Sequence, residues 1–186
     1  MAKVNKTKYA LLVVLSQVSG SGYDIKKFCD SSISHFWNEN YGHIYPVLKR
    51  MEEEELITKE IEQKEGRPSK NIYSITQKGR EDLEQWLMLP VEKNPVRSEL
   101  LLKMFWSKDI PIESIIEKIQ KIKQDCEKDL QEYSKLEKIF TSGEIKVDKK
   151  NLVLWLSTIR YGKYGEETQL KWCEETIKSL EAIKDL

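Results

Sequence analysis

The stretch from Asn40 to Met51 places an apolar stripe and a polar face on opposite sides of a single helix. Ile44, Val47, Leu48 and Met51 follow the i, i+3, i+4, i+7 spacing of an amphipathic helix. The opposite face combines glycine with tyrosine and lysine side chains, which suits close approach to a nucleic-acid groove. Ordinary surface helices share this pattern, so the neighbouring segments decide what this helix is for.

The segments around this helix predict a winged helix-turn-helix. Residues 7–18 have the apolar periodicity of a helix, and Ser21 and Asp24 form a capping box that starts a second one. After the central helix, two β-rich runs at residues 57–63 and 71–76 flank a segment of turn residues, and another helix follows. We therefore expect a mainly α fold, with an α+β character that comes from a two-stranded wing after the third helix.

Two features restrict how the central helix meets a partner. Pro46 lies beyond the first turn and cannot donate to the carbonyl of Gly42, so the sequence predicts an irregular first turn or a kink. The four glutamates from Glu52 to Glu55 would repel DNA phosphates. We therefore expect these carboxylates to face away from DNA, and only the N-terminal half of the helix to enter a groove.

The candidate DNA contacts are basic or hydroxylated residues on three segments. The second helix has Tyr23, Lys26 and Lys27, the central helix has Tyr41, His43, Tyr45 and Lys49, and the hairpin tip has Lys64, Arg67 and Lys70. An arginine at a hairpin tip can enter a minor groove, where negative potential concentrates. A solvated loop is the alternative for the tip, and Tyr23 could equally be a core residue. The sequence does not separate phosphate contacts from base contacts.

From residue 98 onward the sequence predicts an all-helical region. A short apolar helix is followed by a long one, with a heptad-like seam from Ile112 to Phe140, and by a last helix from about Lys149 to Lys184. Pro90 and Pro95 mark a linker between the two halves. The predicted domains are a DNA-binding domain at 1–89, a linker at 90–97 and a helical dimerisation and effector domain at 98–186.

The helical region has more apolar surface than two helices can bury between themselves, which favours a partner chain. The candidate dimer contacts are Leu101, Phe105, Leu152, Trp155, Ile159, Leu170, Ile177 and Leu180, with intramolecular packing as the alternative for each. The flat side chains available to an aromatic effector are Trp106, Trp155, Tyr161 and Trp172, although aromatic stripes are more often core. Gly162 and Gly165 interrupt the stripe of the last helix, which indicates close helix packing, or else a kink or a small-molecule cavity.

Composition excludes several classes of protein. The 31 basic and 31 acidic side chains balance, so a nucleic-acid surface must come from local segregation of charge. Cys29, Cys126 and Cys173 lie far apart on apolar stripes, which predicts reduced buried thiols and no metal site. His35 and His43 have no catalytic partners at useful spacing, so we expect neither an enzyme nor a cofactor. No export signal and no run of roughly 18 apolar residues is present, which predicts a cytoplasmic protein without a membrane partner.

Several motifs resemble, in order and spacing, the PadR family of bacterial transcriptional regulators. They are Tyr9-Ala10-Leu11-Leu12, Ser21-Gly22-Tyr23-Asp24-Ile25, Gly42-His43-Ile44-Tyr45-Pro46-Val47-Leu48, Glu65-Gly66-Arg67-Pro68 and Tyr73-Ser74-Ile75-Thr76-Gln77-Lys78-Gly79. The region after the linker looks like the helical dimerisation domain of the longer, virulence-activator-like members, through its helix pattern and a Leu-x-Lys-Met-Phe-Trp segment.

The resemblance implies a homodimer that binds a near-palindromic, double-stranded operator, usually as a repressor. The central helix would enter the major groove and the wing the minor groove. Some members of the family release DNA when they bind phenolic acids, and others bind flat aromatic drugs. Two positions depart from the family: Met51 replaces the usual leucine, and Glu55 stands where glycine is usual. The alternative function is a winged-helix protein–protein interaction module that does not bind DNA.

Overall fold

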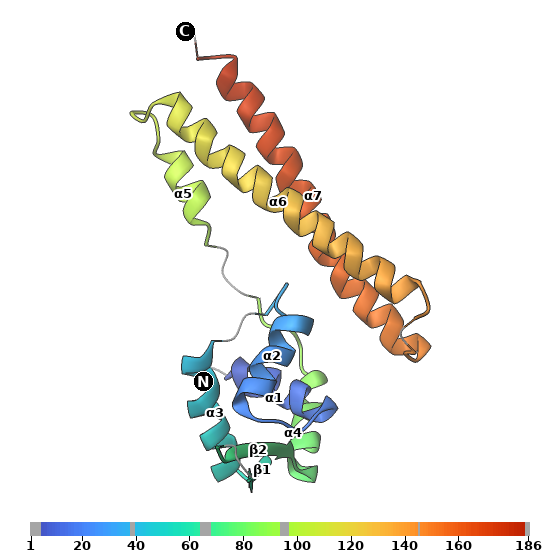
Figure 1. The fold of residues 1–186 in the computed structure, drawn as a ribbon. Coiled ribbons are helices and arrows are strands. Elements are labelled where there is room, and N and C mark those ends of the chain that lie inside the picture. The colour runs from blue at the N-terminus through green and yellow to red at the C-terminus, as the bar shows by residue number, and fades with distance from the viewer. Residues whose placement is uncertain (1–4, 38–39, 64–67, 94–96, 145, 185–186) are drawn as a thin grey trace. The chain divides into compact units, whose positions relative to one another are not determined.

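The computed structural model describes residues 5–37, 40–63, 68–93, 97–144 and 146–184. The chain divides into two compact units, Met1–Lys93 and Asn94–Leu186, and the division falls within the predicted linker. The described residues are mainly helical with a small two-stranded antiparallel sheet, which confirms the predicted fold class (Figure 1). In the part of the chain that the structure describes, no helix is long and apolar enough to cross a membrane.

The first unit is organised around α1 (Lys6–Gln17), which contacts α2 (Gly22–Ser32), α3 (Tyr41–Glu53), α4 (Gln77–Leu87) and the sheet. Neighbours cover α1 on several sides, so it can be apolar around most of its circumference. Its buried side chains include Leu11, Leu12, Val14 and Leu15. The predicted stripe of α3 is also buried, which leaves the polar face of that helix in solvent.

Side-chain caps start α2, α3 and α4, and the first of them is the capping box that the sequence predicts. The Asp24 amide donates to Ser21 Oγ at 3.2 Å, and the Ser21 amide donates to the Asp24 carboxylate at 3.0 Å, so the capping box is complete. The His43 amide donates to Asn40 Oδ1 at 3.1 Å, and the Gly79 amide donates to Thr76 Oγ1 at 3.0 Å. Each contact satisfies an amide that the first helical turn leaves unpaired.

Two positions of α3 and the turn after it are unusual. Pro46 lies inside α3, which is helical from Tyr41 to Glu53, and the His43 and Ile44 amides both donate to the Asn40 carbonyl at 3.0 and 3.2 Å in its first turn. At the other end, Glu55 adopts a left-handed φ of 59°, and the Leu56 amide donates to the Met51 carbonyl at 2.9 Å. The turn that usually needs glycine therefore forms with glutamate.

The wing is a hairpin of β1 (Ile57–Glu62) and β2 (Lys70–Ile75), paired from Ile57 with Ile75 to Glu62 with Lys70. The turn between α1 and α2 pairs with β2 like a third strand, through Gly20 and Tyr73, which exchange two backbone hydrogen bonds at 3.1 and 2.9 Å. The Ser74 hydroxyl also donates to the Ser19 hydroxyl at 2.8 Å. The base of the wing is therefore attached to the start of α2.

The second unit contains α5 (Glu99–Phe105) and an antiparallel pair, α6 (Ile112–Thr141) and α7 (Lys149–Glu181), which lie side by side (Figure 1). Two ion pairs cross between α6 and the α7 segment: Lys123 Nζ lies 2.9 Å from Glu174, and Lys184 Nζ, just after the end of α7, lies 3.3 Å from Glu113. The buried residues of this pair are Ile116, Ile119, Cys126, Tyr133, Ile159 and Cys173. The seam predicted on α6 therefore packs against α7 of the same chain.

All three cysteines are buried and none of them forms a disulfide, as the sequence predicts. Burial, followed by a hydrogen bond with Glu166, raises the pKa of the Cys126 thiol to about 12. Burial also raises the pKa of Cys173. Thiols with such pKa values carry almost no thiolate at neutral pH, so these two act as small apolar side chains of the α6–α7 core.

Candidate nucleic-acid interface

The exposed face of α3 presents three of the four residues predicted for it. His43, Tyr45 and Lys49 are exposed, because Ile44, Leu48 and the rest of the apolar stripe turn into the core. The side chain of Tyr41 lies outside the part of the chain that the structure describes. The exposed face thus offers an imidazole, a phenol and an ammonium group, all of which can reach phosphates or base edges.

Tyr45 joins this face to the start of α2. A Cβ atom added at Gly22 would lie 2.6 Å from Tyr45 Cε1, so the ring fits only because residue 22 is glycine. Tyr45 nevertheless remains half exposed, and the neighbouring Tyr23 is also exposed rather than a core residue. Two tyrosines from different helices therefore lie at the same junction, which the sequence alone did not show.

Basic residues of α2 and of the wing meet near Asp24. Hydrogen bonds from the side chain and backbone of Ser21 hold the pKa of Asp24 below its ordinary value, and the nearby charges of Lys70 and Lys27 lower this pKa further. The pairing of Gly20 with β2 explains why a wing lysine comes close to α2. Lys27 and Lys70 are exposed, whereas Lys26 is partly buried and forms an ion pair with Asp30. Tyr23, Lys27, Tyr45 and Lys70 thus make one surface, hereafter the α2–wing surface.

The acidic run at the C-terminal end of α3 lies partly on the same face as Lys49. Glu53 Oε1 lies 3.9 Å from Lys49 Nζ one turn away, so this carboxylate shares the face that carries Lys49 instead of facing away from it. Glu52 Oε2 lies 3.0 Å from Lys59 Nζ on β1. The reason is geometric, because residues four apart on a helix are neighbours and β1 runs back beside the end of α3. The ion pair between Lys59 and Glu52 was not predicted, because sequence spacing does not reveal ion pairs between side chains of different elements.

The hairpin tip is described only in part. Lys64 and Arg67 lie outside the described residues, so their predicted role stays a prediction. Within the described ranges, no group of histidine, cysteine, aspartate and glutamate side chains is arranged to hold a metal ion.

The residues predicted for dimer contacts fall into two groups. Leu101 and Phe105 of α5 are exposed, the latter by 83%, and α5 has no buried residue. Those on α7 face α6 to different extents: Ile159 is buried at 8% exposure, Trp155 is 40% exposed, and the remaining four, Leu152, Leu170, Ile177 and Leu180, are partly buried. Intramolecular packing thus accounts for much of the α7 stripe and for little of α5.

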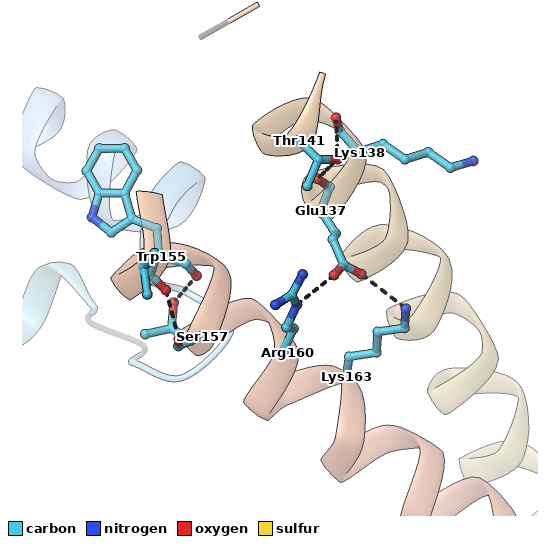
Figure 2. A network of polar contacts seen from close by, with 9 residues as sticks. Glu137, Lys138, Thr141, Trp155, Ser157, Arg160 and Lys163 are labelled. Carbon is cyan, nitrogen blue, oxygen red and sulfur yellow. Dashed lines mark hydrogen bonds and ion pairs between the residues drawn. The ribbon is translucent and has the colours of Figure 1, made fainter. Parts of the chain in front are cut away.

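The four aromatic side chains predicted for an effector are not gathered into one group by the described contacts. Trp155 packs edge-on against Phe140 with ring centroids 5.6 Å apart, Trp172 is partly buried, and Trp106 and Tyr161 are exposed. Close to Trp155, the Glu137 carboxylate bridges α6 to α7 by accepting from Arg160 Nε at 2.8 Å and Lys163 Nζ at 3.2 Å (Figure 2). These two bonds lower the pKa of Glu137. Within the described residues, the contacts of Glu137 with Arg160 and Lys163 connect α6 to α7.

An α3 whose polar face is exposed and a wing attached to α2 define a winged helix-turn-helix domain, which is followed in the sequence by a helical second unit. Residues 11–85 match the Transcriptional regulator PadR-like family, and residues 96–181 match the Virulence activator alpha C-term family. The chain therefore belongs to the PadR-like family of transcriptional regulators, and it carries the virulence activator alpha C-terminal domain. Its family consists of regulators, not enzymes.

Two curated relatives agree with this assignment. The chain is 26% identical to the Probable transcriptional regulator Rv1176c of Mycobacterium tuberculosis over 184 residues, which is 93% of this chain and 96% of the relative. It is 32% identical to the Negative transcriptional regulator PadR of Bacillus subtilis over 101 residues, which is 53% of this chain and 55% of that protein.

Solved structures show the same fold. B. subtilis PadR in complex with operator DNA gives a TM-score of 0.83 at 20% identity, over 95% of this chain and 99% of that one. The same protein in complex with p-coumaric acid gives 0.73 at 20% identity, over 94% and 98%. The Vibrio cholerae virulence activator AphA gives 0.73 at 27% identity, over 95% and 98%.

Proposed function

We propose that the chain is a cytoplasmic, homodimeric repressor that binds a near-palindromic operator. The observation that carries this proposal is the α2–wing surface, where exposed tyrosines and lysines from α2, α3 and β2 converge beside the polar face of α3. The N-terminal half of α3 would enter the major groove, and the hairpin tip would reach the adjacent minor groove. The B. subtilis relative, which is named a negative regulator and was solved with operator DNA, supports the same assignment.

The residues of this surface divide by the part of DNA that they reach. Tyr23 and Lys27 at the start of α2 contact phosphates, together with Lys70 at the start of β2. Tyr41, His43, Tyr45 and Lys49 face the major groove, and Lys64 and Arg67 reach the minor groove from the hairpin tip. Lys26 contributes least, because Asp30 already pairs with it. The phosphate contacts position the protein, and the groove contacts select the sequence.

DNA binding is tested with the intergenic DNA upstream of the gene for this protein, using fluorescence anisotropy at several salt concentrations. We expect log Kd to rise with log salt by about 0.9 for each phosphate neutralised. Arg67→Ala is expected to weaken binding by about tenfold, because a minor-groove arginine replaces counterions in a region of concentrated negative potential. Gln63→Ala, beside the tip, is the matched control and leaves binding unchanged.

Two results of this experiment would favour other functions. Absent or salt-insensitive binding would favour the protein–protein interaction module, because a phosphate interface always responds to salt. Release of the DNA by p-coumaric acid, the ligand of one B. subtilis PadR structure, would support an aromatic effector. We propose such an effector as a partner of the second unit, where Trp106, Trp155, Tyr161 and Trp172 supply flat side chains, and unchanged binding with p-coumaric acid would count against this ligand.

We propose that a second copy of the chain covers α5. Leu102 and Phe105 are 71% and 83% exposed, and Trp106 continues the same apolar segment. Side chains of this size seldom stay exposed together, because each loses about 1.5–3 kcal/mol relative to burial. An isologous interface between two copies would bury two such segments at once.

The double substitution Leu102→Glu and Phe105→Glu is expected to convert the dimer into monomers, because it places four charges in a twofold interface. Sedimentation velocity on the full chain measures the change. Ile61→Glu on β1, where isoleucine is also exposed, serves as the control and retains the dimer. A double variant that sediments as the wild type would exclude α5 from the interface.

A further inference from the structure

A groove separates the C-terminal half of α3 from the wing. Its volume is about 480 Å³, and its lining consists of Lys49, Glu52 and Glu53 on α3, Lys59 on β1 and Tyr73 on β2. Lys49 extends the exposed face that begins with Tyr45, and Tyr73 is the residue whose backbone pairs with Gly20 at the start of the α2–wing surface. The groove therefore lies next to the surface proposed to meet DNA.

The two lysines of this groove are neutralised by carboxylates of the same groove. Lys59 Nζ donates to Glu52 Oε2 at 3.0 Å, and both side chains keep about a third of their exposure. The hydrogen bond and charge of Glu52 raise the pKa of Lys59, so this lysine stays protonated and paired. Lys49 Nζ lies 3.9 Å from Glu53 Oε1, and both of these side chains are more exposed. Two positive and two negative charges thus cancel along this edge of α3.

If its carboxylates were absent, the groove would be able to bind a phosphodiester group. Two ammonium groups from different elements, one on the DNA-facing helix and one on the wing, would flank a single open channel. Each ammonium group contributes a charge-assisted hydrogen bond to a phosphate oxygen and releases condensed counterions. Such contacts ignore sequence, so they strengthen binding to every duplex. Glu52 and Glu53 weaken such phosphate contacts in two ways: they form ion pairs with the lysines, and their negative charges repel the phosphates.

We propose that this groove is an additional phosphate-binding surface that Glu52 and Glu53 hold in a neutralised state, and that these glutamates thereby limit sequence-independent binding to DNA. The proposal rests on the proposed function, because it concerns how strongly the same DNA-binding unit grips the backbone. It also gives the acidic run a role: by pairing with Lys49 and Lys59, the carboxylates limit contact between the C-terminal half of α3 and the DNA backbone.

The test measures the affinity of the full-length protein for a short duplex of arbitrary sequence over a range of salt concentrations. Glu52→Gln frees Lys59, so we expect about tenfold tighter binding and a salt slope steeper by about 0.9. The double variant Glu52→Gln/Lys59→Gln restores the net charge and is expected to return the slope to the wild-type value. Glu53→Gln, which frees Lys49, repeats the test at a more exposed position.

Glu113→Gln is the matched control, because it removes a carboxylate that pairs with Lys184 at 3.3 Å in the second unit. It changes the net charge equally and should leave the slope unchanged. The proposal is overturned if neither Glu52→Gln nor Glu53→Gln steepens the slope, or if the double variant keeps the steeper slope. If the wild-type chain binds the upstream DNA but the single variants leave the affinity and the salt slope unchanged, only this inference is overturned. A wild-type chain that binds no duplex at any salt concentration overturns the proposed function as well.

Discussion

Replacing Gly79 with alanine is expected to lower the free energy of unfolding of the first unit by about 3 kcal/mol. A Cβ atom at this position would lie 2.2 Å from the Leu56 carbonyl oxygen, which is backbone and cannot rotate away. The same carbonyl accepts from the Thr76 amide at 3.0 Å, so moving it breaks the joint between β1 and α4. Thermal unfolding should show a Tm lower by about 15 °C.

Hydrogen exchange can assign this loss to the correct unit. Protection should fall before Lys93 and remain in α6 and α7, because the two units pack separately. Lys78→Ala is the control at the adjacent residue: it removes an exposed ion pair with Glu55 and adds no atom near Leu56, so stability should not change measurably. An alanine at position 79 that left Tm unaltered would show that α4 does not depend on this close approach.

Replacing Gly162 with alanine is expected to destabilise the helix pair of the second unit by about 2 kcal/mol, although alanine is the better helix former. The added Cβ would lie 2.4 Å from Tyr133 Cζ and Oη. Tyr133 is only 6% exposed, so its ring has little room to move. Urea unfolding followed by circular dichroism measures the effect as a lower midpoint at constant m-value.

Replacing Gly165 on the same helix with alanine is expected to have the opposite effect on stability. Nothing lies within 4 Å of a Cβ atom added there, so Gly165→Ala should stabilise α7 by about 1 kcal/mol through helix propensity alone. In a Tyr133→Leu background, Gly162→Ala should lose most of its penalty, which a double-mutant cycle would detect as coupling. Equal effects of alanine at 162 and 165 would contradict close packing as the reason for Gly162.

Features that depend on one or two turns of chain were predictable from the sequence. The capping box at Ser21 and the buried stripe of α3 form as expected, and the structure adds caps at Asn40 and Thr76. Each involves residues within a few positions of one another, so the local hydrogen bonds and apolar periodicity decide the outcome. The order of the elements indicated the winged helix-turn-helix, and the resemblance of several motifs indicated the PadR-like family; both are confirmed.

Contacts between elements were not predictable in the same way. The sequence offered the same alternatives for Gly162 and Gly165 and could not separate the two positions, but only Gly162 faces a neighbouring ring. It also left open whether the α7 stripe packs within the chain or at a dimer seam, and the structure shows that Ile159 is buried within the chain. These outcomes depend on the rotation and register of one helix against another, which long-range packing determines and a single periodic pattern does not.

By itself the sequence determined where the helices and the wing begin and which faces turn inward, because these properties follow from local spacing, and its motifs indicated the family by resemblance. Only the tertiary structure decided that Tyr45 fits against Gly22, that Lys27 and Lys70 meet near Asp24, and that Glu52 pairs with Lys59. The physical reason is that charges and rings on separate elements interact only after packing has brought those elements within a few ångströms of one another.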